Sequence, residues 1–152
     1  MLIKTKCFGD VDVAQEKIIR FENGIMGFED YKEFTILFDS DKEASKTIMW
    51  LQSVDEQALA LPVVDPLLIS DSYDPIVEDE LLASVGEIKE NDLLILVTLT
   101  VPSDITKMTA NYKAPIIINA GTLKGVQLIA ENEDYQIKHP VYDILKARKD
   151  GE

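Results

Sequence analysis

The chain has 152 residues, of which 46% are hydrophobic and 28% are charged, and its formal net charge is −13 at pH 7. This length is typical of one folded domain, and the hydrophobic content is too high for an intrinsically disordered chain. An acidic body repels nucleic acid and anionic membranes and attracts basic partners, so direct binding to nucleic acid or to a membrane is not expected.

The start of the chain carries charge at Lys4 and Lys6 and has no long apolar stretch, which is not typical of a signal peptide. The longest apolar run, residues 93–101, is far shorter than the roughly 20 residues that a membrane-spanning helix needs. We therefore expect a cytoplasmic protein.

Residue types that build common catalytic and metal sites are scarce. Cys7 and His139 are the only cysteine and histidine, which excludes a disulfide within the chain and a zinc site. We expect Cys7 to be a buried, inert thiol in a strand. No nucleophile elbow or phosphate loop occurs, and a pair among 28 acidic residues would be unspecific. We therefore expect a protein that is not an enzyme and holds no cofactor.

Short runs of alternating or β-branched residues, bounded by turns, predict a mainly β fold: a small antiparallel β-barrel-like domain. Gly9-Asp10 predicts a two-residue turn after a strand over residues 2–8. Leu93 to Val101 predicts a central strand buried on both faces. Further strands are expected over residues 18–21, 34–38, 47–53, 58–64, 116–119 and 126–130, the last two forming a hairpin.

The clearest helix signal covers Pro75–Val85. Asp74 is a suitable N-cap, Pro75 suits the first helical position, and Gly86 suits the position after the end. Helical spacing of apolar residues after Val141 predicts a short C-terminal helix. We expect residues 1–145 to form a single β-barrel-like domain and residues 146–152 to form a charged, disordered tail.

The loop from Phe21 to Glu29 carries Gly24 and Gly27 together with three apolar side chains. Either these side chains plug one end of the barrel, or they form a contact surface for a partner. The plug is the favoured hypothesis, because clustered apolar residues usually join a core.

A set of short segments, none of them a catalytic motif, follows in a distinctive order along nearly the whole chain. They are Ile3-Lys4-Thr5 to Phe8-Gly9, Gly24-Ile25-Met26-Gly27-Phe28-Glu29, Trp50-Leu51-Gln52-Ser53, Val64-Asp65-Pro66, Thr109-Ala110-Asn111, Ala114-Pro115-Ile116-Ile117-Ile118-Asn119, Glu131-Asn132 to Tyr135, and His139-Pro140. In order and spacing they resemble the FliW family of flagellar assembly factors. Met26 is one departure, since the family usually has proline there.

The resemblance implies a cytoplasmic β-barrel-like protein without enzymatic activity that binds two partners in turn. One is flagellin, which the family binds as a chaperone before export. The other is CsrA, a small RNA-binding repressor of translation, which the free factor captures so that repression of flagellin synthesis is relieved. We expect the free protein to be a monomer.

Candidate binding residues are the members of these segments that we expect to be exposed, together with acids near the start of the predicted helix. The alternative is a turn or cap role for the polar residues and a core position for the tyrosine. The candidates are Gln52, Asn111, Tyr112, Asp71, Asp74 and Glu78.

A different class of function is a small-ligand-binding β-barrel of unknown ligand, whose interior would hold a cavity. The nearly unbroken apolar run Leu93–Val101 favours a filled core instead. An absence of pockets above roughly 300 Å³ would make a ligand-binding barrel improbable.

Overall fold

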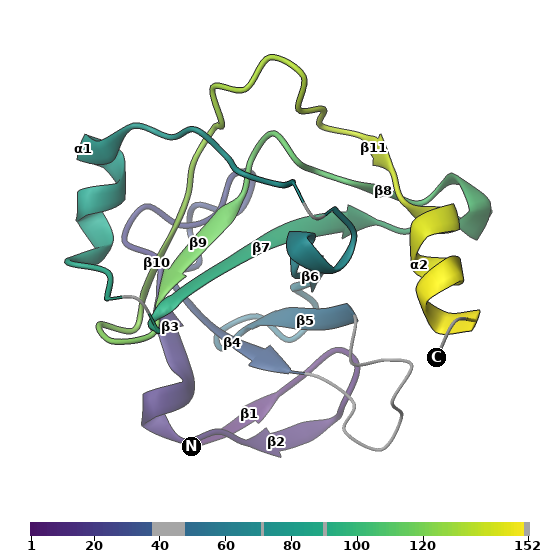
Figure 1. Ribbon diagram of the computed structural model, residues 1–152. Coiled ribbons are helices and arrows are strands. Elements are labelled where there is room, and N and C mark those ends of the chain that lie inside the picture. Colours follow the sequence, from purple (N-terminus) through teal and green to yellow (C-terminus); the bar gives the residue numbers. More distant parts are fainter. Residues whose placement is uncertain (38–47, 71, 90, 151–152) are drawn as a thin grey trace.

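The computed structural model in Figure 1 describes residues 1–37, 48–70, 72–89 and 91–150. Its centre is a barrel of seven strands in the order β7-β6-β5-β4-β3-β10-β9, closed by pairing between β9 and β7. The strands are β3 (Ile18–Arg20), β4 (Glu33–Leu37), β5 (Ile48–Ser53), β6 (Ala60–Val64), β7 (Leu93–Thr100), β9 (Ile116–Asn119) and β10 (Lys124–Gln127).

Nearly all neighbouring strands of the barrel are antiparallel, which confirms the predicted fold class. The predicted hairpin is confirmed as β9 and β10, although β10 begins at Lys124 rather than at residue 126 and ends at Gln127. Lys124 lies opposite Asn119, and Gln127 lies opposite Ile116. The exception is β3, which pairs with β10 in parallel at the single position Arg20–Lys124. This parallel contact was not predicted, because the two segments lie far apart in the sequence.

The barrel interior is filled by apolar side chains from six of its strands and from the loop after β3, while β10 contributes none to this cluster. Phe21 and Phe34 are fully buried there and meet edge to face, with ring centroids 5.6 Å apart. Leu96 belongs to the same cluster, whereas Val97 packs into a second cluster outside the barrel wall. The prediction that the Leu93–Val101 run is buried on both faces is therefore confirmed at its centre, while Leu93 and Val101 are exposed.

Shorter elements surround the barrel. A separate hairpin of β1 (Leu2–Lys4) and β2 (Asp10–Asp12) lies beside it, and β8 (Thr109–Ala110) and β11 (His139–Pro140) extend from β7. The connections include the 3-10 helices η1 (Gln15–Lys17), η3 (Pro66–Leu68) and η5 (Ile105–Lys107).

The first predicted turn is wrong. Asp10 already belongs to β2, and the connection is a longer loop closed by Thr5. The Thr5 hydroxyl donates to the Gly9 carbonyl at 2.7 Å and accepts from the Phe8 N–H at 2.9 Å. Cys7 lies in this loop and is exposed, which corrects the expectation of a buried thiol in a strand.

The predicted helix is shorter than Pro75–Val85. It consists of α1 (Asp79–Leu82) and the 3-10 turn η4 (Ala83–Val85), with Glu78 rather than Asp74 at the N-cap. The reason is that the preceding backbone bonds elsewhere. Asn132 accepts from the Ile76 N–H at 2.6 Å and donates to the Asp74 carbonyl at 3.0 Å, which keeps this segment extended. The predicted end is confirmed, since Gly86 follows with φ 83°.

The C-terminal helix is α2 (Tyr142–Asp150), which packs against the second apolar cluster through Tyr142, Ile144 and Leu145. It includes most of the segment expected as a charged, disordered tail, so the helix is longer than predicted. Across the described residues, no helix has the length and apolar content needed to cross a membrane.

Candidate functional site

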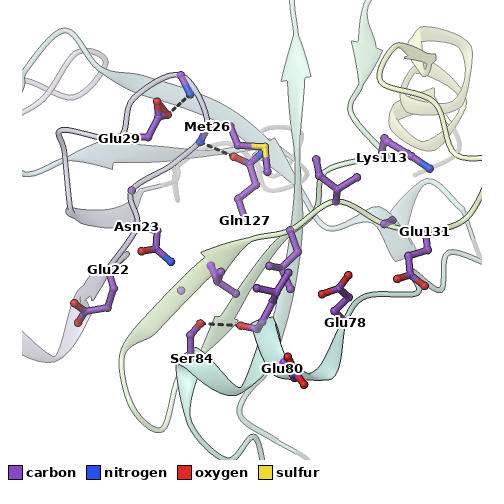
Figure 2. Close-up of a pocket in the computed structure, with 18 residues that line it drawn as sticks. Glu22, Asn23, Met26, Glu29, Glu78, Glu80, Ser84, Lys113, Gln127 and Glu131 are labelled. Carbon is purple, nitrogen blue, oxygen red and sulfur yellow. Dashed lines mark hydrogen bonds between the residues drawn. The ribbon is translucent and has the colours of Figure 1, made fainter.

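A groove of about 910 Å³ lies on the outside of the barrel, between two walls and a floor (Figure 2). One wall is the loop that follows β3, one is the helical turn of α1 and η4, and the floor is β10 with its continuation. Its lining residues include Glu22, Met26, Glu29, Glu78, Glu80, Leu81, Ser84, Lys113, Gln127, Ile129 and Glu131.

The floor is an extension of the barrel sheet beyond the end of β10. The ladder continues because Leu128 donates to the Pro115 carbonyl at 3.1 Å and Ala130 donates to the Lys113 carbonyl at 2.7 Å. Leu128 is buried beneath η4, whereas the side chain of Ile129 points the other way and is 54% exposed. The alternation of a strand therefore leaves Ile129 as the exposed aliphatic side chain of the groove floor.

The loop wall is shaped by two glycines in the left-handed region, Gly24 at φ 70° and Gly27 at φ 89°. A Cβ atom on Gly24 would lie 2.5 Å from the backbone of Glu29, so only glycine fits there. Ile25 is buried in the barrel core, and Met26 is 46% exposed and lines the groove. The loop thus supplies a plug through Ile25 and an open apolar side chain through Met26.

Gln127 fixes the loop wall to the floor. Its side-chain carbonyl accepts from the Met26 N–H at 2.9 Å, and its amide nitrogen donates to the Ala114 carbonyl at 3.1 Å. Figure 2 shows the Gln127 side chain beside Met26, with a dashed line marking the hydrogen bond to the loop. The opening is therefore held by hydrogen bonds rather than by loop packing alone.

Carboxylates dominate the charge of the groove. Its lining holds five glutamates, namely Glu22, Glu29, Glu78, Glu80 and Glu131, against the single cation Lys113. Lys113 is held by a hydrogen bond from its ammonium group to the Asn132 carbonyl at 2.8 Å. An apolar floor within an acidic rim is a surface suited to a cationic, partly apolar partner.

Among the described residues, no group of three or more His, Cys, Asp and Glu side chains is placed to hold a metal ion.

Two predicted binding residues, Gln52 and Tyr112, are not exposed. Gln52 is 1% exposed, because its side chain organises the β5–β6 connection. Its carbonyl accepts from the Lys6 N–H at 3.0 Å. Its amide nitrogen lies 3.0 to 3.3 Å from four carbonyl oxygens, those of Ser53, Glu56, Gln57 and Leu59.

Tyr112 is 4% exposed and belongs to an aromatic cluster outside the barrel wall. It stacks on His139 at 4.2 Å between ring centroids and meets Tyr73 edge to face at 5.2 Å. Tyr73 in turn stacks on Tyr135 at 4.9 Å. Burial, together with the neighbouring tyrosines, raises the pKa of both Tyr73 and Tyr112. The core position was the alternative for Tyr112, and it is the one found.

The other candidates divide between turn and surface positions. Asn111 accepts from the N–H groups of Lys113 and Ala114, both at 3.1 Å, which is a turn role. Asp74 and Glu78 are exposed, and only Glu78 lines the groove. Asp71 lies outside the described residues.

A second hollow of about 410 Å³ lies at one mouth of the barrel, lined by Lys17, Ile19, Ile36, Leu94 and Ile118 among others. Both hollows exceed the roughly 300 Å³ of small ligand sites. Since the barrel interior is filled, a ligand-binding function would use the mouth or the outer groove rather than the enclosed cavity that the alternative required.

Comparison with known proteins shows the family of the chain. The profile of the FliW protein family matches residues 2–141. The chain belongs to the FliW family. A FliW relative from Lachnospira eligens, named flagellar assembly factor FliW, is 52% identical over 147 residues, covering 96% of this chain and 97% of the relative. One of the same name from Lachnoclostridium phytofermentans is 50% identical and covers 100% and 99%.

The fold agrees with the FliW assignment. The crystal structure of a flagellar assembly factor FliW superposes with a TM-score of 0.82 at 33% identity, covering 93% of this chain and 96% of that chain. The resemblance seen in the sequence is thereby confirmed over its full extent.

Most groove residues were missed by the sequence analysis of this FliW-family chain. Only Glu78 among the candidates lines it, although Met26 was noted as a possible contact residue. Ile129 could have been found from its strand, because alternation places Leu128 inside and therefore leaves its aliphatic neighbour outside. The position of Leu81 on the facing wall could not have been found in this way, since no sequence pattern shows which strand a short helix covers.

Proposed function

We propose that this chain is a cytoplasmic flagellar assembly factor that works by binding proteins and has no catalytic step. It binds flagellin as a chaperone. When free, it binds CsrA and antagonises this translational repressor, so that flagellin synthesis is relieved of repression. The observation that supports the proposal is the groove, in which five glutamates surround the exposed side chains of Met26, Leu81 and Ile129.

The charge of the chain fits one partner directly. A net charge of −13 attracts a basic RNA-binding protein. This attraction raises the association rate more than it raises the affinity of the final complex. A switch between two partners needs only that binding of one weakens binding of the other, which is a linkage of binding free energies.

The test is titration calorimetry of the chain with purified CsrA from the same organism, repeated after saturation with flagellin. We expect binding of CsrA by the free chain and its loss when flagellin is bound. Raising the salt concentration should slow association, since screening weakens the attraction between opposite charges. A chain that binds neither protein would contradict the proposal, and simultaneous, independent binding of both would contradict the switch.

A further inference from the structure

Strand β10 has an open edge where it crosses the groove. The N–H groups of Leu128 and Ala130 bond toward β9, so the alternation of an antiparallel ladder turns those of Gln127 and Ile129 to the opposite edge. On that edge β3 pairs only at Lys124–Arg20 and then ends. Outside the sheet ladders, no hydrogen bond of the described residues uses the N–H of Gln127 or Ile129, and the ladder with β3 does not extend to them.

The open edge lies among exposed apolar side chains. Ile129 is 54% exposed, and Leu81 and Met26 on the two walls are 49% and 46% exposed. An unpaired strand edge beside apolar surface is a site at which an extended segment of another protein adds as a further strand. Main-chain hydrogen bonds would hold such a segment, and its alternate side chains would contact the walls.

The rim determines the charge of such a segment. Glu78 and Glu131 line the side of the groove toward α1, and Glu22 and Glu29 line the side toward the loop. Lys113 is engaged with the Asn132 carbonyl. A segment that carried carboxylates would meet like charge on both sides, whereas lysine or arginine side chains would be attracted.

We propose that the groove binds a short, extended segment of a partner protein in which lysine or arginine side chains alternate with aliphatic ones. The segment pairs with the edge of β10 at Gln127 and Ile129. The inference deepens the proposed function, on which it rests for the premise that the chain acts by binding proteins.

The first test uses a synthetic peptide of alternating lysine and valine with blocked ends. We expect saturable binding that slows hydrogen exchange at the Gln127 and Ile129 amides, measured by nuclear magnetic resonance. The same peptide N-methylated at every residue has no backbone donors and should bind about tenfold more weakly or not at all. A peptide of alternating glutamate and valine should not bind. Equal binding of the methylated peptide, or unchanged exchange at both amides, would overturn the proposal.

Variants locate the site. Ile129→Lys places a cation on the floor and should weaken binding of the lysine–valine peptide about tenfold or more. Ile137→Lys is the matched control, because Ile137 is 64% exposed and lies outside the groove lining. Glu78→Gln should weaken binding more than Glu133→Gln, which changes an exposed acid elsewhere. Leu81→Lys is a second groove variant in case Ile129→Lys unfolds. Groove variants that bind as tightly as their controls would contradict the proposal.

The same variants separate this inference from the proposed function. Each is titrated with the two partner proteins named above. If the unaltered chain binds neither, the proposed function fails. If it binds them and Ile129→Lys and Leu81→Lys leave both affinities unchanged, the groove assignment fails while the proposed function stands. Loss of one partner identifies the protein that supplies the segment.

Discussion

The ring of Phe21 occupies the space that a side chain at Gly125 would need. A Cβ atom on Gly125 would lie 2.5 Å from Cε2 of Phe21, closer than such atoms can approach. Gly125 stands opposite Ile118 in the β9–β10 hairpin, and Phe21 is fully buried in the barrel core. The glycine thus lets the barrel close around a phenylalanine.

Gly125→Ala should therefore lower the free energy of unfolding by about 1 to 3 kcal/mol, the usual cost of overpacking a core. Urea unfolding measures it. Gly121→Ala is the matched control, because its Cβ would meet the carboxylate of Asp92, which can rotate away. Adding Phe21→Leu to Gly125→Ala should recover part of the loss, and no recovery would argue against this clash.

Gln52→Ala should destabilise the chain by about 2 to 4 kcal/mol, because it leaves buried backbone groups without partners and opens a cavity. Gln57→Ala is the control, since among the described residues the side chain of this exposed glutamine makes only a long hydrogen bond of 3.4 Å, to the Thr5 carbonyl. Thermal or urea unfolding of both variants measures the two losses of stability. Equal losses would show that the Gln52 side chain does not hold the β5–β6 connection.

Tyr112→Phe should leave the chain as stable or raise the free energy of unfolding by up to about 1 kcal/mol, since it removes a buried polar group that has no partner. Among the described residues, the Tyr112 hydroxyl is buried without a hydrogen bond. The phenyl ring keeps the stack on His139. A loss of stability in urea unfolding would mean that the hydroxyl is bonded in solution.

Stability should fall in alkaline solution because of Tyr73. Burial raises its pKa in the folded state, so the folded chain keeps a proton that the unfolded chain loses above pH about 10. The contribution is complete below that pH and declines by about 1 kcal/mol per pH unit above it. Urea unfolding from pH 9 to 11 measures the decline.

The free energy of unfolding of the Tyr73→Phe variant should decline less steeply with pH. At neutral pH this variant should be less stable than the unaltered chain, because it loses the hydrogen bond from the Tyr73 hydroxyl to the Tyr112 carbonyl. Tyr31→Phe is the control from outside the cluster. Identical pH dependence in the unaltered chain and Tyr73→Phe would refute the assignment.

Local patterns predicted the elements whose residues decide their own conformation. The β9–β10 hairpin and the buried centre of β7 followed from runs of β-branched and aliphatic residues. Gly86 marked the end of the helical turn because a left-handed position favours glycine. The barrel class followed from the number and spacing of such strands.

Features that depend on distant partners could not be predicted. Asp74 and Pro75 form a good helix start in isolation, but Asn132 bonds the backbone at Asp74 and Ile76 and keeps it extended. Gln52 is a polar residue that looked exposed, and it is buried because a loop folds around its amide. The groove joins segments from three parts of the chain, so no single stretch shows it.

The parallel contact between Arg20 and Lys124 has a consequence for synthesis. Loop closure becomes costlier as the intervening chain lengthens, so this pairing is among the slowest to form. Until residues beyond 124 have left the ribosome, β3 has no β10 beside it and the groove has no floor. If the groove binds a partner as proposed, a chain interrupted before that point lacks the surface that would bind it.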